Sequence, residues 1–271
     1  MSDLGMLRVW GFPRPVRRAA KYGQLALRLF VAVLGPWIVL GLAAVAILGS
    51  RGYLADAVAI VVSLLISCMV VAAVSVHGYK ALDSGLAKSA PDRADYERVK
   101  GLMLGFSQQL GLGEGELVVA AYSMVNAAAV AGRRRSYKLI VTSGALRELD
   151  LLELEALVAR ELAQVRLGLV GINCLIAFWD RMLFRSGRQA TGWQRAEASM
   201  LDAAAVSVTR YPPAMTSLVR KAFASLQGVA SASLQGWLWM IPVGYRELDA
   251  DSEMRLQALE DEFWALSWAE E

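Results

Sequence analysis

Histidine and cysteine are almost absent from this chain of 271 residues. The single histidine is His77, and the two cysteines are Cys68 and Cys174. The cysteines lie far apart and each falls inside an apolar run, so they form neither a metal-ligand motif nor a disulfide framework. We therefore expect both cysteines to be buried by packing. With one imidazole in the whole chain, sites that need two histidines are excluded.

Sequence patterns of several common active sites are also missing. No serine lies in a Gly-x-Ser-x-Gly elbow, and no P-loop is present. Gly111, Gly113 and Gly115 follow a predicted helix, so they lack the strand-turn-helix context of a dinucleotide-binding motif. The formal net charge of +3 is too small to indicate a nucleic-acid-binding protein, and we expect no nucleic acid partner.

Long apolar runs, by contrast, are abundant. Hydrophobic residues make up 56% of the chain and the mean hydropathy is +0.41, which exceeds what soluble domains normally carry. Two uncharged runs, Leu29–Gly49 and Ala57–Val76, each have about the 20 residues that a helix needs to cross a bilayer. Residues 50–56 between them are long enough only for a tight turn. The sequence therefore predicts a transmembrane helical hairpin over residues 29–80.

Basic residues flank this hairpin on both sides. By the positive-inside rule, both of its ends face the cytoplasm. We therefore predict a basic cytosolic N-terminus over residues 1–28 and a cytosolic domain over residues 92–271. Nucleic acid binding by the N-terminal arginines is an alternative, but orientation and contact with anionic lipids explain them more simply. The basic residues concerned are Arg8, Arg14, Arg17, Arg18, Lys21 and Arg28 before the hairpin, and Lys80 and Lys88 after it.

The pattern after residue 92 predicts a mainly helical α+β domain with a small sheet. Asp150 and Glu153 form a predicted capping box, which opens a helix with apolar residues along one stripe. Residues 132–136 read as an exposed turn between two strands. The other predicted helices span Asp92–Leu110, Ala196–Thr209, Ala214–Leu226 and Ser252–Trp268, and the predicted strands span Leu117–Tyr122, Ala127–Ala131 and Tyr137–Thr142.

Two shorter apolar segments lie in the second half of the chain. Leu167–Trp179 is short for a membrane span, so a buried or interfacial helix is favoured over a third transmembrane segment. Gly236–Val243 contains two tryptophans, which favour the core slightly over the membrane interface.

The order of these elements resembles the HtpX-like and CAAX-protease-like membrane zinc metallopeptidases, which are gluzincins of the HExxH type. The resemblance rests on short motifs in a matching order rather than on any one specific motif. It implies an N-terminal membrane hairpin followed by a metallopeptidase-type domain. The matching pieces are Val125-Asn126-Ala127-Ala128, Gly132, Leu139–Leu146, Leu149-Asp150, Asp202–Val206, Thr209–Met215, Trp237–Pro242, Arg255 and Leu259.

The resemblance also implies that the zinc ligands are lost. The HExxH segment aligns with Arg160-Glu161-Leu162-Ala163-Gln164, so only the general-base position, Glu161, is kept. Arginine has no lone pair for a metal, and a glutamine amide oxygen is a weak ligand. The family's third ligand, four residues before Asp202, aligns with Ala198, and its later histidine-proline aligns with Asp249-Ala250. We expect no intact catalytic site, no metal and no zinc.

Arg160 has two alternative environments. Its guanidinium either bridges the carboxylates of Glu161, Glu197 and Asp202 in place of the metal, or it faces solvent.

The functional hypothesis is a catalytically inactive pseudopeptidase in a bacterial cytoplasmic (inner) membrane. It is expected to bind or scaffold another membrane or membrane-associated protein, or to form a homo-oligomer, besides contacting the lipid bilayer. The resemblance implies that a peptide adds to a sheet edge beside the helix of Arg160, although an ordinary interior strand is the alternative for that segment. An active peptidase with an unconventional site and a transport or channel component are the other hypotheses. The candidate partner-binding residues are Val125, Asn126, Ala127, Ala128 and Ala129.

Overall fold

The computed structural model describes residues 86–131, 136–171, 173–174, 192–226, 238–241 and 253–261. All of them belong to one compact unit of the chain. The predicted N-terminus at 1–28 and hairpin at 29–80 lie outside the described residues, as do Cys68 and His77. Among the helices that are described, none is long and apolar enough to cross a bilayer.

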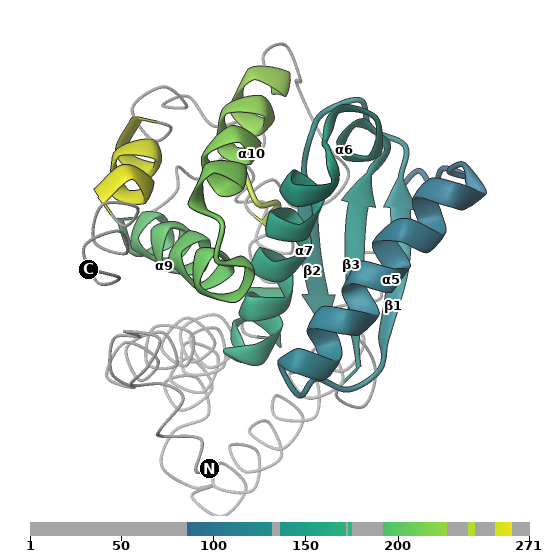
Figure 1. The fold of residues 1–271 in the computed structure, drawn as a ribbon. Coiled ribbons are helices and arrows are strands. Elements are labelled where there is room, and N and C mark those ends of the chain that lie inside the picture. The colour runs from purple at the N-terminus through teal and green to yellow at the C-terminus, as the bar shows by residue number, and fades with distance from the viewer. Residues whose placement is uncertain are drawn as a thin grey trace, which may run out of the picture. The chain divides into compact units, whose positions relative to one another are not determined.

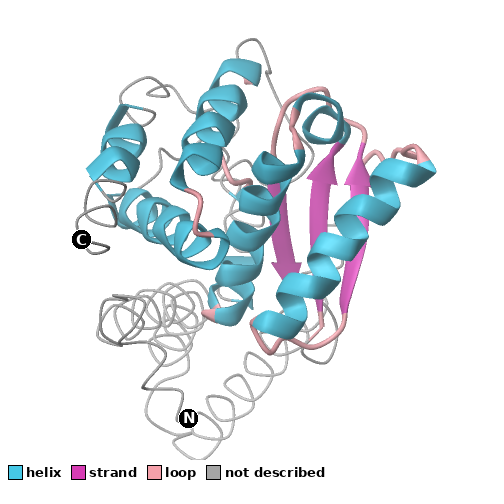
Figure 2. Cartoon of the chain, viewed as in Figure 1, coloured by secondary structure: helices cyan, strands magenta, loops and turns pink. Residues whose placement is uncertain are grey.

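The domain is mainly helical with a small sheet, as the sequence predicted (Figure 2). The three strands are β1 (Gly115–Ala120), β2 (Ala127–Ala131) and β3 (Tyr137–Thr142), and their order is β1-β3-β2. β3 pairs parallel with β1, placing Leu117 opposite Leu139, and antiparallel with β2, placing Ala129 opposite Leu139. β2 therefore lies at one edge of the described sheet.

Helices α5 (Arg93–Gln109) and α7 (Leu151–Arg166) cover one face of this sheet (Figure 1). Helices α9 (Gly192–Thr209) and α10 (Pro212–Ser225) pack against α7. A short helix, α6 (Ser143–Glu148), follows β3 directly, and residues 253–261 form another helix. Because α7 contacts the sheet as well as α5, α9 and α10, it lies in the middle of the domain.

Local sequence signals explain where α5 and α7 begin and end. Helix α5 stops at Gln109, where Gly111 adopts a φ of 62°, a left-handed conformation that favours glycine. Helix α7 opens with the predicted capping box: Glu153 N–H donates to Asp150 Oδ1 and Asp150 N–H donates to Glu153 Oε2, both at 2.9 Å. Helix α10 reinforces this start, since Ser217 Oγ lies 2.6 Å and Lys221 Nζ 2.7 Å from the Glu153 carboxylate.

Some predicted boundaries were wrong. Helix α10 starts at Pro212 rather than after Pro213, because proline fits the first helical turn, where its missing N–H costs no hydrogen bond. The stretch Leu238–Ile241, part of the apolar segment Gly236–Val243, is irregular backbone outside the sheet, and its side chains are all buried, as the slight preference for the core predicted. Cys174 is buried, as expected. Residues 169–171, 173 and 174 of the Leu167–Trp179 segment are helical, and Leu169, Val170, Asn173 and Cys174 are buried. Residues 172 and 175–179 of that segment, and residues 132–135 of the predicted turn, lie outside the described residues.

Candidate functional site

The candidate site lies in the second half of α7. Every residue from Ala156 to Gln164 is buried, including the three polar residues Arg160, Glu161 and Gln164. Arg160 and Gln164 are four residues apart and therefore project from the same side of the helix. The expected third-ligand position, Ala198, lies on α9 one helical turn before Asp202.

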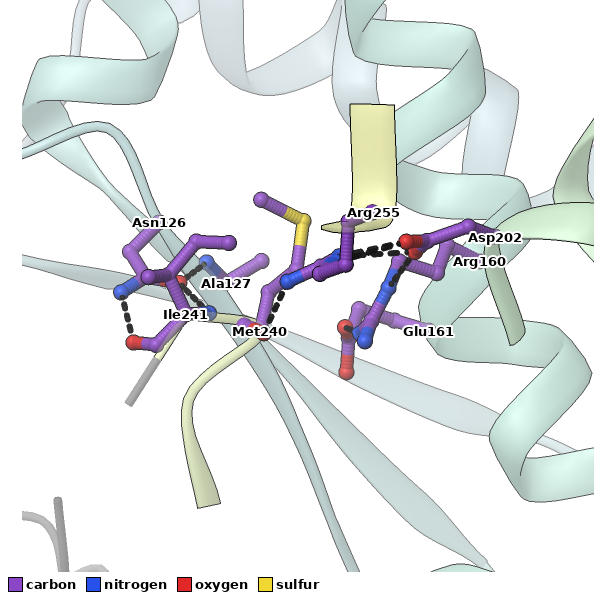
Figure 3. A network of polar contacts seen from close by, with 8 residues as sticks. All are labelled: Asn126, Ala127, Arg160, Glu161, Asp202, Met240, Ile241 and Arg255. Atoms are coloured by element: carbon purple, nitrogen blue, oxygen red, sulfur yellow. Dashed lines mark hydrogen bonds and ion pairs between the residues drawn. The ribbon is translucent and has the colours of Figure 1, made fainter. Parts of the chain in front are cut away.

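Arg160 bridges two buried carboxylates. Its Nε donates to Asp202 Oδ1 at 2.7 Å, and its Nη1 donates to Glu161 Oε1 at 2.6 Å (Figure 3). The three side chains are 4%, 1% and 0% exposed, respectively. The bridging alternative is thus confirmed for Glu161 and Asp202, and the solvent-facing alternative is wrong. The side chain of Glu197 lies outside the described residues.

A second arginine completes the network, and sequence reasoning did not place it there. Arg255 donates through Nε to Asp202 Oδ2 and through Nη2 to Asp202 Oδ1, both at 2.8 Å. It therefore binds the carboxylate in a bidentate way. It comes from the helix at 253–261, four residues before buried Leu259. An arginine on the apolar side of an amphipathic helix was the signal that could have identified it. We call Arg160, Glu161, Asp202 and Arg255 the charge network.

The formal charges of this network cancel when both carboxyl groups are ionised. Burial disfavours a charged guanidinium, but Asp202 and Glu161 outweigh it and hold the pKa of Arg160 above its ordinary value. Burial also raises the pKa of Glu161, and neither Arg160 nor the nearby Ala129 backbone N–H fully offsets this. Glu161 Oε2 has no hydrogen-bond partner among the described residues.

The donor set does not fit a zinc ion. The position that the resemblance assigns to the first ligand holds a guanidinium that is already bonded to Glu161 and Asp202, and the position that it assigns to the third ligand is an alanine. Within the described parts of the chain, no three His, Cys, Asp or Glu side chains come together as a metal-binding group. No zinc-dependent step can therefore be derived from these residues.

The candidate partner-binding residues lie at the edge strand, but they are covered. Val125 and Asn126 precede β2, Ala127 to Ala129 lie within it, and all five are at most 1% exposed. Val125 N–H donates to Ser225 Oγ at 2.8 Å, and Met240 N–H donates to the Ala127 carbonyl at 2.7 Å. β2 is thus an edge strand, as peptide addition to the sheet would require, rather than an interior strand. Its Ala127 carbonyl, however, already accepts a hydrogen bond from Met240 of the same chain.

Replacing Glu161 with glutamine should change how stability depends on pH. A carboxyl group whose folded pKa is raised binds more protons in the folded state, so its ionisation destabilises the fold progressively above the ordinary glutamate pKa of about 4.3. The unfolding free energy of the unsubstituted chain, minus that of Glu161→Gln, should therefore fall as pH rises from about 4 to 7. Denaturant unfolding at several pH values measures this difference. A difference that rises with pH would contradict the raised pKa.

The resemblance predicted that Arg160, Glu161, Ala198 and Asp202 lie in one site. In the structure, α7 packs against α9, and Arg160 donates a hydrogen bond to Asp202. The clamp on Asp202 by Arg255 was not anticipated. The chain matches no protein-family model and no curated protein.

Proposed function

We propose that this protein is a membrane-anchored, catalytically inactive HtpX-like pseudopeptidase. It binds or scaffolds another membrane or membrane-associated protein at the cytosolic face of a bacterial inner membrane. The observation that carries the proposal is the Arg160 guanidinium, which is held between Glu161 and Asp202 where a metallopeptidase of this type needs imidazole.

The state of Glu161 supports the loss of catalysis. A general base must reach a water molecule with a free, ionised oxygen. Glu161 Oε1 accepts a hydrogen bond from Arg160 at 2.6 Å, Oε2 is buried with no exposed surface from which to reach a water molecule, and burial raises the pKa of the carboxyl group. The side chain is wholly buried, so this one retained position contributes to the internal charge network.

Restoring the ligands provides a direct test. In Arg160→His/Gln164→His/Ala198→Glu, two imidazoles lie four residues apart on α7, and a carboxylate lies on α9 one helical turn before Asp202, which contacts residue 160. We expect the purified full-length triple variant to retain about one zinc ion per chain after dialysis, and the unsubstituted chain to retain none. Metal analysis by mass spectrometry measures both. The matched control, Arg160→His/Gln164→Leu/Ala198→Glu, lacks one ligand and should bind zinc much more weakly.

Two results would count against the proposal. Stoichiometric zinc in the unsubstituted chain would show that the protein has a metal site, which the charge network does not provide. Chelator-sensitive cleavage of a denatured membrane protein, lost in Glu161→Gln, would favour an active peptidase with an unconventional site. If the triple variant does not fold, these two measurements on the unsubstituted chain still decide the matter.

A further inference from the structure

We draw no further inference here: the strongest candidate, the exposed side of α5 on which Gly101, half-exposed Leu104 and Gly105 lie together, carries none, because it is an unpartnered helix face and nothing among the described residues shows what covers it.

Discussion

Replacing Asp202 with alanine should lower the unfolding free energy by about 3–5 kcal/mol, because it removes the carboxylate that two buried guanidinium groups share. Asp202 is 1% exposed and receives donors from both Arg160 and Arg255. Without it, Arg160 still pairs with Glu161, whereas Arg255 loses both hydrogen bonds to a carboxylate and keeps its long hydrogen bond to the Met240 carbonyl and its contact with the Phe223 ring. The loss is a large part of the roughly 5–15 kcal/mol that stabilises a typical domain.

Denaturant unfolding of the purified full-length chain, followed by tryptophan fluorescence, measures this loss. The matched control is Glu260→Ala, which removes a carboxylate from an ion pair with Arg220 in which both side chains are about 60% exposed. That change should cost less than about 0.5 kcal/mol, since solvent screens exposed pairs. An equal, small effect of both substitutions would mean that the charge network contributes little to the fold.

The elements with strong local signals were predictable from the sequence. The run Tyr137–Thr142 gave β3 with its observed ends, and the Asp150–Glu153 capping box marked the start of α7. Both depend on residues that are close in the chain, such as alternating β-branched side chains and a carboxylate three residues from its backbone partner.

The surroundings of α7 were not predictable in the same way. A stripe of apolar residues shows which side of a helix is buried, but it does not show whether the other side is also covered. Here α9 and α10 cover it, so Arg160 is inside the domain. Ala156, Ala159 and Ala163 have small side chains, which allow neighbouring elements to pack close to the helix. They are the one local feature of the sequence that indicates that both sides of α7 are covered.

The pairing of Arg255 with Asp202 was beyond sequence reasoning, because 53 residues separate the two. Spacing along the chain carries no information on such a contact unless the order of the elements in space is known. The same holds for Leu238–Ile241, since its apolar composition predicted burial but not the edge strand against which it lies.

Replacing Gly144 with alanine should also destabilise the fold strongly, by about 2–3 kcal/mol or more, through overpacking against backbone. A Cβ at Gly144 would lie 2.0 Å from the Ser123 carbonyl oxygen and 2.5 Å from that of Met124. Backbone at 122–126 cannot yield easily, because Gly144 N–H donates to the Tyr122 carbonyl at 2.9 Å and Thr142 Oγ1 donates to the Met124 carbonyl at 2.6 Å. A shift there would also move Asn126, which should loosen its hold on Ile241.

Gly101→Ala is the matched control, since it makes the same chemical change on an exposed side of α5. No atom lies within 4 Å of the Cβ it would add, and alanine is the better helix former, so this variant should gain about 0.5–1 kcal/mol. Unfolding curves of the two variants should therefore move in opposite directions from that of the unsubstituted chain. If Gly144→Ala were as stable as Gly101→Ala, the backbone at 122–126 would have to move far more easily than its hydrogen bonds to Gly144 and Thr142 indicate.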